Sequence, residues 1–152
     1  DASDLILRIK EAYDGAEPSG NSVAILALLK LGAIAGREQL TAAAKKSLRL
    51  FAARLQHAPQ AVPYMLTALD FSLQEPRRAV VAGDPNSNSA KTLIQTLHSV
   101  YQSNKVVLGN AGFVEEFART LPARAQPVVY LCSGNACQPP TSDPEVLKAA
   151  LS

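Results

Sequence analysis

Two carboxylates that could do acid–base chemistry, Asp14 and Glu17, lie close together in a short polar loop. The loop, residues 14–22, reads DGAEPSGNS and leads directly into a strongly apolar segment. Its glycines permit backbone torsions that other residues resist, so the loop can turn sharply and aim its polar side chains. If the loop faces a cavity, Asp14 and Glu17 are the candidate catalytic residues, as general acid and general base.

The same loop also has a structural interpretation as a helix cap. Pro18 has a fixed φ and biases Glu17 towards extended torsions. Ser19 or Asn21 is then placed to cap the apolar helix by accepting a hydrogen bond from a free backbone N–H. In this interpretation the loop faces solvent, with one negative charge beside the positive end of the helix dipole. Composition alone favours the cap.

Composition and charge exclude several classes of partner. The 152 residues carry a net charge of +2 and 18% of them are charged, so there is no basic stripe for nucleic acid. Aromatic residues make up 5% and tryptophan is absent, which weakens stacking against bases. No apolar run reaches the length of about 18 residues that a membrane span needs. We therefore expect neither nucleic acid nor a membrane as a partner.

The cysteine content and the first residue set further expectations. Two cysteines do not make a disulfide scaffold, so the reducing cytoplasm is the expected location. The chain begins with Asp1 rather than Met, which indicates a fragment or a processed product of a longer protein. No motif calls for a cofactor, and none is expected.

Three helices are expected in the first half of the chain. Residues 23–35 are apolar around nearly the whole helix, with Lys30 as the sole charge, and Gly36 is placed to end it. Residues 38–55 instead show an apolar stripe opposite a face of basic residues, which indicates a helix half exposed to water. A third, mainly apolar helix begins with Pro63 at its first position.

These helices alternate between buried and half-exposed, which is the pattern of helical hairpins stacked around a ring. An isolated bundle of three helices would expose part of its apolar inner layer. We therefore expect this layer to be covered, either by a second copy in a homo-oligomer or by N-terminal segments of the same protein. Ahead of the helices, residues 5–10 favour a short extended segment, with a first helical turn as the alternative.

The second half predicts strands that alternate with helices. Short runs rich in β-branched residues predict three strands, at 79–82, 105–108 and 127–132. The first of the helices between and after them is expected to face inward with Leu93, Ile94, Leu97, Val100 and Tyr101. A shorter helix is expected around Phe113, Val114, Phe117 and Ala118, and a last one at 144–151. Unbroken apolar strands separated by helices predict a small three-stranded parallel sheet, Rossmann-like in topology only. The predicted fold class is therefore α plus α/β, with helical hairpins in residues 1–75 and a small α/β domain in residues 76–152.

Two motifs of the second half have ordinary interpretations. Residues 83–92 (GDPNSNSAKT) lie between a strand and a helix, but the spacing of Gly and Lys does not match a phosphate-binding loop, so a capped turn is expected. Cys132 and Cys137 could close a small disulfide, although buried free thiols are the expected state. Their spacing is not that of a thioredoxin motif, and two sulfurs do not complete a zinc site.

A resemblance to a known family is carried by four stretches in collinear order. They are residues 13–22 (YDGAEPSGNS), 63–71 (PYMLTALDF), 80–83 (VVAG) and 132–140 (CSGNACQPP). They resemble the C-terminal part of the thioredoxin-domain-containing proteins related to spermatogenesis-associated protein 20. The resemblance implies a thioredoxin-like domain and most of a six-hairpin (α/α)6 toroid ahead of this chain, similar to N-acylglucosamine 2-epimerases. This chain would hold the end of the toroid and the α/β tail, without the redox cysteines of the thioredoxin domain.

The resemblance also bears on the loop, because loops at one end of the inner helices line the cavity of such toroids. It implies that Asp14, Glu17 and Asn21 could face a pocket, with paired carboxylates suited to sugar chemistry. The candidate binding residues are Tyr13, Ser19, Asn21 and Asp70, a carbohydrate is the candidate ligand, and no metal site is expected. The preferred function is a non-catalytic C-terminal module that serves packing or association. A carbohydrate-directed isomerase or hydrolase is the alternative.

Overall fold

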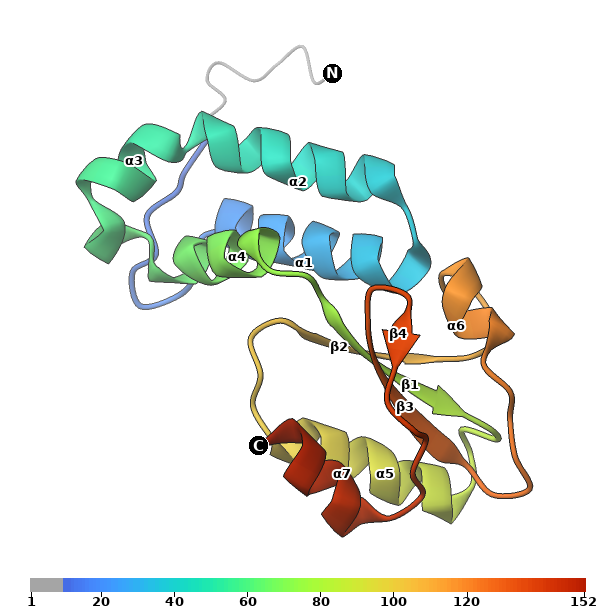
Figure 1. Cartoon of the computed structure of the whole chain (residues 1–152). Coiled ribbons are helices and arrows are strands. Elements are labelled where there is room, and N and C mark those ends of the chain that lie inside the picture. The colour runs from blue at the N-terminus through green and yellow to red at the C-terminus, as the bar shows by residue number, and fades with distance from the viewer. Residues whose placement is uncertain (1–9) are drawn as a thin grey trace.

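The computed structural model describes residues 10–152 and arranges them in three layers (Figure 1). A helical layer covers one face of a sheet, and two further helices cover the other face. The helical layer consists of α1 (Gly20–Ala35), α2 (Glu38–Leu50), α3 (Ala52–His57), the short 3-10 helix η1 (Pro59–Ala61) and α4 (Pro63–Leu73). The extended segment expected at 5–10 lies outside the described residues except for Lys10, which is in neither a helix nor a strand.

The first helix begins and ends as its sequence predicts. Ser19, one of the two predicted caps, accepts a hydrogen bond at Oγ from the Ser22 N–H, with an N–O distance of 3.2 Å. At the other end Gly36 takes left-handed torsions with φ 64°, and its N–H donates to the Gly32 carbonyl. The predicted apolar helix is therefore confirmed, and its first turn starts slightly before the apolar residues.

α1 packs very closely against the start of α2 at Gly32. A Cβ atom placed on Gly32 would overlap Oγ1 of Thr41 and would lie 3.3 Å from the Thr41 backbone nitrogen. It would also lie 3.4 Å from the carbonyl oxygen of Arg37. Because only glycine lacks a Cβ atom, this position sets how near the two helices can come.

The single helix predicted for residues 38–55 is broken at Phe51. Phe51 has φ −97° and ψ 8°, and its N–H donates to the carbonyls of both Ser47 and Leu48. Its ring is buried in the core, so the chain leaves α2 where this large apolar side chain turns inward. The helix α4, by contrast, begins with Pro63 at its first position, as predicted.

The sheet is mixed rather than parallel. It contains β1 (Arg77–Ala82), β2 (Lys105–Gly109), β3 (Val128–Ser133) and β4 (Ala136–Cys137), in the order β2-β1-β3-β4. β2 runs parallel to β1, as predicted, whereas β3 is antiparallel to β1 and β4 is antiparallel to β3. The prediction that the third strand is parallel is therefore wrong, and β4 is a strand that the sequence pattern does not indicate.

The helix between β2 and β3 is too short to carry the chain back across the sheet. This helix, α6 (Glu116–Thr120), has 5 residues, or about 7–8 Å of length at the usual rise, whereas a strand of that many residues spans about 17 Å. The rest of the connection does not return across the sheet either, so β3 starts beside Ala82, where β1 ends, and runs in the opposite direction. Phe113, around which this helix was predicted, precedes it instead and is 93% exposed.

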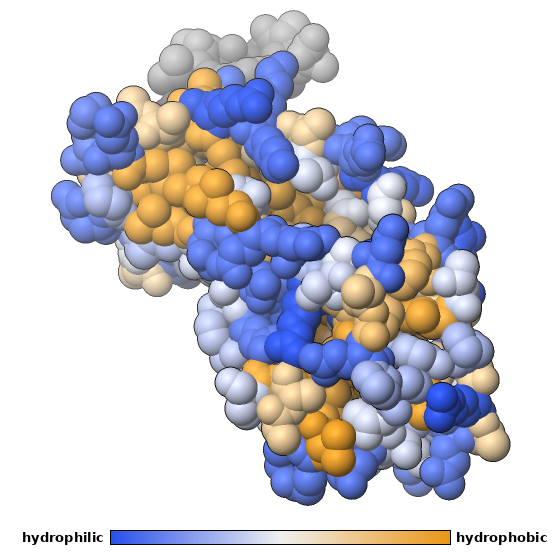
Figure 2. All heavy atoms as spheres, in the orientation of Figure 1, coloured by the Kyte–Doolittle hydropathy of each residue, from blue (hydrophilic) through white to orange (hydrophobic). Residues whose placement is uncertain are grey.

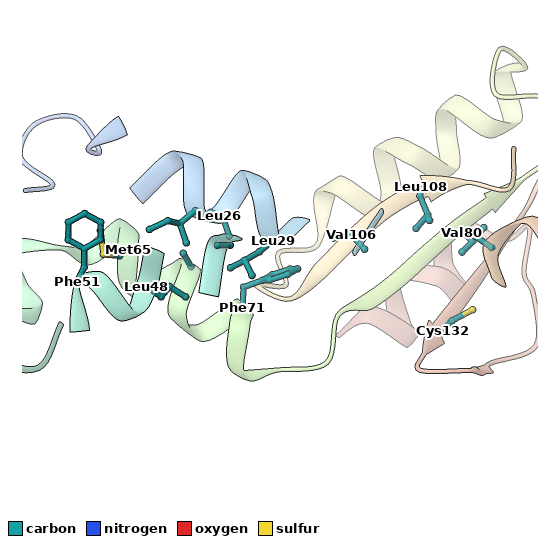
Figure 3. Close-up of a cluster of buried hydrophobic side chains, with 14 of the residues drawn as sticks. Leu26, Leu29, Leu48, Phe51, Met65, Phe71, Val80, Val106, Leu108 and Cys132 are labelled. Carbon is teal, nitrogen blue, oxygen red and sulfur yellow. The ribbon is translucent and has the colours of Figure 1, made fainter. Parts of the chain in front are cut away.

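Alternate residues of β1 and β3 face two different hydrophobic clusters. The larger cluster joins one face of the sheet to the helical layer, and Figure 3 shows it running from Phe51 and Met65 to Val80 and Cys132. The smaller cluster joins the opposite face to α5 (Asn88–Ser99) and α7 (Pro144–Leu151). The two parts predicted for the chain, residues 1–75 and 76–152, thus share one apolar core across their boundary.

α5 ends earlier than the sequence pattern indicates. Val100 and Tyr101, predicted as inward-facing helix residues, both follow the helix, and Tyr101 is 83% exposed. The Nζ of Lys105 donates to the carbonyls of Leu97 and Val100. This ammonium group takes the place of the backbone N–H groups that a further helical turn would supply.

Side chains cap α5 and α7, the two helices on the other face of the sheet. Ser87 precedes α5, and its Oγ accepts a hydrogen bond from the Ala90 N–H at 3.2 Å. Asp143 precedes α7, and its carboxylate accepts one from the Glu145 N–H at 2.8 Å. The segment that superficially resembles a phosphate-binding loop is therefore an ordinary capped turn, as predicted.

The two cysteines form a disulfide bond. Cys132 and Cys137 are directly opposite each other in β3 and β4, with their Cα atoms 4.0 Å apart. The expectation of two free thiols is therefore wrong. The register of the hairpin decides the matter, because it places both Cβ atoms on the same face, and the spacing alone does not show this.

Replacing Gly32 with alanine should destabilise the protein. The added Cβ has no space between α1 and α2, so we expect the free energy of unfolding to fall by about 1–3 kcal/mol. Urea unfolding followed by circular dichroism measures the change. Gly20→Ala is the matched control, because a Cβ added there would meet no atom within 4 Å, and it should alter stability by no more than about 1 kcal/mol. Equal effects of the two changes would contradict the close packing at Gly32.

Candidate functional site

The carboxylate of Asp14 joins the starts of two helices. One oxygen, Oδ1, accepts a hydrogen bond from the Ser19 N–H at 2.8 Å, just before α1. The other, Oδ2, accepts from the N–H groups of Tyr64 and Met65 at 2.9 and 3.1 Å, in the first turn of α4. The Asp14 N–H itself donates to the Ala61 carbonyl at 2.9 Å. Asp14 thus satisfies N–H groups that would otherwise lack a partner at the beginning of α4.

The environment of Asp14 favours its ionised form. Burial by itself would raise the pKa of the carboxyl group, whose residue is 7% exposed. Hydrogen bonds from the Ser19 N–H and the Ser22 side chain act in the opposite direction, as do those from the Met65 and Tyr64 N–H groups. Together the hydrogen bonds outweigh burial and hold the pKa of Asp14 below its ordinary value of 3.8. A carboxylate held in this way is a poor general acid.

Glu17, the predicted catalytic partner of Asp14, is placed differently. Its side chain is exposed, and no hydrogen bond or ion pair is formed by it among residues 10–152. Ala16 and Pro18 flank it in the exposed outer part of the loop. The environments of the two carboxylates therefore differ strongly, but only Asp14 is enclosed by the protein.

The candidate binding residues have separate places in the fold. Ser19 caps α1, and Asn21 donates from Nδ2 to the Glu11 carbonyl at 2.5 Å, so both hold the loop together. Tyr13 is exposed beside Gly15. Asp70 lies further along α4, where its Oδ1 accepts a hydrogen bond from Gln74 Nε2 at 2.7 Å. The loop thus gathers Tyr13, Ser19 and Asn21 near Asp14, while Asp70 is engaged in a contact of its own.

A cleft lies elsewhere, where the helical layer meets the sheet. It has a volume of about 690 Å³, which lies in the range of small-molecule sites. Leu29 and Phe71 line it, together with the charged residues Glu38, Lys45 and Glu75. None of the candidate residues from the loop lines this cleft. No sequence pattern indicates it, because its walls come from segments far apart in the chain.

Arg78 of β1 is the charged residue that joins the walls of this cleft. Its Nη1 is 2.6 Å from Oε1 of Glu115, and both side chains are largely buried. Its Nη2 donates to the Gly134 carbonyl at the tip of the β3–β4 hairpin, and its guanidinium lies 5.3 Å from the centre of the Phe117 ring. The one sequence signal that could have identified Arg78 is a basic residue at the start of an otherwise apolar strand.

Among residues 10–152, no three His, Cys, Asp or Glu side chains come close enough together to hold a metal ion. None of the helices in this part of the chain combines the length and apolar character that crossing a bilayer requires.

Asp14→Asn should destabilise the protein in a pH-dependent way. Asn offers one acceptor oxygen in place of two, and its NH2 group would face a backbone N–H, so we expect a loss of about 1–3 kcal/mol at neutral pH. Because folding lowers the pKa of Asp14, the stabilisation is present above the ordinary pKa and is lost as the pH falls through the lower folded-state pKa. Urea unfolding at about pH 7 and at about pH 3, on either side of the ordinary pKa of a carboxyl group, measures both effects.

The matched control for Asp14 is Glu17→Gln in the same loop. Glu17 has no partner to lose within the described residues, so the change should alter stability by less than about 0.5 kcal/mol. A difference between wild type and Asp14→Asn that stays constant over the acidic range would disprove the capping role of the ionised carboxylate.

Several known proteins are similar in sequence to this chain. No family model matches it, and no solved structure matches it. It is 35% identical to spermatogenesis-associated protein 20 of Rattus norvegicus over 157 aligned positions, which cover 98% of this chain and 20% of the relative. The human protein of the same name is 36% identical over 97% of this chain and 20% of its own length. An uncharacterised Caenorhabditis elegans protein, B0495.5, is 29% identical over 90% of this chain.

These matches confirm the relationship to spermatogenesis-associated protein 20 that the four sequence stretches indicated. The aligned region contains almost all of this chain, but the chain spans only about one-fifth of the length of the relatives it matches, 20% in each case. The chain is therefore homologous to one-fifth of spermatogenesis-associated protein 20.

Proposed function

We propose that this chain is a non-catalytic module of a longer protein, and that its helical part serves to pack against further helices. The observation that carries the proposal is an apolar stripe on α1, formed by Val23, Ala24, Ala27 and Leu31. These residues recur at helical spacing and are all exposed, with Val23 at 43% and Leu31 at 51%. The opposite side of α1 is covered by α2, α4 and β2.

The helix α1 is apolar but is covered on one side alone, and this supports the proposal that a neighbouring element is missing. A surface helix normally presents polar residues to water, and larger exposed apolar patches commonly mark interfaces. Figure 2 shows that apolar side chains also gather on the visible face of the helical layer, over α3 and α4. The remaining four-fifths of the relatives' length would supply ample chain to cover such a surface. We propose that α1, α2 and α4 are the end of an (α/α)6 toroid, with α1 and α4 in its inner layer.

The alternative is a carbohydrate-directed isomerase or hydrolase site at Asp14 and Glu17. Its weakness is the geometry of Asp14, because both carboxylate oxygens already accept backbone hydrogen bonds. Its lowered pKa also removes the proton that a general acid must donate. The packing module is therefore the better supported function, and the carbohydrate site is the second proposal.

The apolar stripe should make the isolated chain associate. We expect sedimentation velocity at micromolar concentrations to reveal oligomers, because each uncovered Val or Leu gains about 1.5–3 kcal/mol when buried. The double change Val23→Ser with Leu31→Ser should weaken association by at least about tenfold. Leu50→Ser is the matched control, since Leu50 is similarly exposed but lies on α2. A wild-type chain that stays monomeric at these concentrations would refute the packing proposal.

A panel of mono- and disaccharides tests the second proposal in a full-length relative. If the loop only caps helices, turnover on the panel should be absent, or should persist at the same rate when the residues aligned with Asp14 and Glu17 become Asn and Gln. Product analysis by chromatography gives the readout, and circular dichroism confirms folding of each variant. Turnover that falls by about a hundredfold or more, the usual contribution of acid–base catalysis, in both folded variants would instead establish the carbohydrate site.

A further inference from the structure

The disulfide Cys132–Cys137 belongs to a row of three side chains on one face of the sheet. Arg78 of β1 is directly opposite Cys132 of β3, and Cys132 is directly opposite Cys137 of β4. Directly opposite residues of neighbouring strands place their Cβ atoms about 4.5–5.5 Å apart on the same face. The arginine side chain therefore flanks the disulfide on the side of Cys132.

The two sulfur-bearing residues differ in their access to solvent. Cys132 is 1% exposed and belongs to the large apolar cluster. Cys137 packs against the same cluster but is only partly buried, in a strand of two residues at the edge of the sheet. A reagent that approaches the disulfide therefore reaches the Cys137 sulfur first.

We propose that Cys132–Cys137 is a thiol–disulfide exchange site that a dithiol reduces through Cys137, and that its reduction releases the β3–β4 hairpin from the cleft. Nothing in this exchange depends on the packing function proposed above. The site takes a small dithiol or an exposed dithiol of another protein as its reaction partner.

The exchange proceeds in two balanced steps. A thiolate of the dithiol attacks Sγ of Cys137, a new S–S bond forms between them, and the bond to Cys132 breaks. Cys132 leaves as a thiolate on the face of the sheet that also carries Arg78, and the positive charge of Arg78, although paired with Glu115, stabilises the thiolate until it takes a proton from water. The second thiol of the dithiol, as a thiolate, then attacks the dithiol sulfur that is bonded to Cys137. A disulfide forms within the dithiol, and Cys137 is released as a thiolate that takes a proton from water. The protein gains two electrons and two protons as two thiols, and the dithiol is oxidised to a disulfide.

Reduction would loosen one wall of the cleft. The tip of the hairpin supplies Gly134 and Asn135 to the cleft lining, and the Gly134 carbonyl accepts a hydrogen bond from Arg78. Arg78 is also paired with Glu115, whose N–H donates to the Ile34 carbonyl at the end of α1. Without the covalent bond, the short β4 keeps only its few backbone hydrogen bonds to β3.

The attacked sulfur can be identified with a monothiol. Glutathione, added in moderate excess to the protein purified without reductant, should form a mixed disulfide that mass spectrometry of peptides can locate. We expect at least about ten times more glutathione on Cys137 than on Cys132, because exchange follows access to the sulfur. Equal labelling, preference for Cys132, or two free thiols in the protein before treatment would each overturn the proposal.

Arg78→Gln tests the stabilisation of the leaving thiolate. Reduction by dithiothreitol, followed by alkylation and mass spectrometry over time, should be slower by roughly threefold to tenfold, because a leaving thiol of higher pKa leaves more slowly. A purely structural role for Arg78 in holding the hairpin would make reduction faster, so an unchanged or faster rate contradicts the proposed role. Arg119→Gln is the matched control on α6, and its exposed side chain should leave the rate unchanged.

Release of the hairpin has its own readout. Hydrogen exchange of the full chain, oxidised and reduced, should show faster exchange at residues 133–138 after reduction, with α5 unchanged as an internal reference. The double variant Cys132→Ser with Cys137→Ser should reproduce the reduced pattern without any reductant. Equal protection of the hairpin in oxidised and reduced protein would show that the disulfide does not hold it.

Discussion

The helical layer depends on one buried carboxylate. Asp14 accepts hydrogen bonds from the backbone just before α1 and from the first turn of α4, so a single side chain fixes where both helices begin. Its negative charge also lies at the positive end of the α4 dipole. The burial of a charge is costly unless hydrogen bonds compensate for it, and here backbone donors supply that compensation. Asp14, whose residue type suggested catalysis, therefore has a structural role.

Once the two helix starts are joined, the apolar side chains behind them can form a continuous core. α1 and α4 carry apolar residues around most of their surface, and the sheet supplies the second wall of the large cluster. The alternation of β1 and β3 then leaves the other sheet face for α5 and α7. The exposed stripe of α1 is one part of this apolar surface that the described residues leave open, which is why we propose that it serves packing.

The junction between the helical layer and the sheet concentrates the polar contacts of the molecule. Arg78 meets a carboxylate, a hairpin carbonyl and an aromatic ring within one partly buried space. A guanidinium group suits this position because its planar donors reach several partners at once. The hairpin that it touches is closed by the disulfide, so a covalent bond and an ion pair meet at the wall of the same cleft.

The sequence by itself determined most of the local elements of this protein, but not the break at Phe51 or the strand β4. Apolar periodicity, the cap at Ser19, the left-handed Gly36 and the initial Pro63 predicted their helices correctly, because caps and torsional preferences act within a few residues. The three apolar strand segments were found for the same reason. The homology to spermatogenesis-associated protein 20 could also be recognised from short motifs.

Only the tertiary structure decided how these elements meet. The direction of β3 depends on the path of the chain between strands, and the pairing of Cys132 with Cys137 depends on the register of β3 and β4. Two partners of the Asp14 carboxylate, Tyr64 and Met65, lie 50 and 51 residues along the chain, so its role at the start of α4 could not be inferred from the loop. The cleft at Arg78 was missed for the same reason. Local sequence carries the preferences of the backbone. Strand direction, disulfide pairing and the hydrogen-bond partners of a buried carboxylate are instead set by contacts between segments that lie far apart in the sequence.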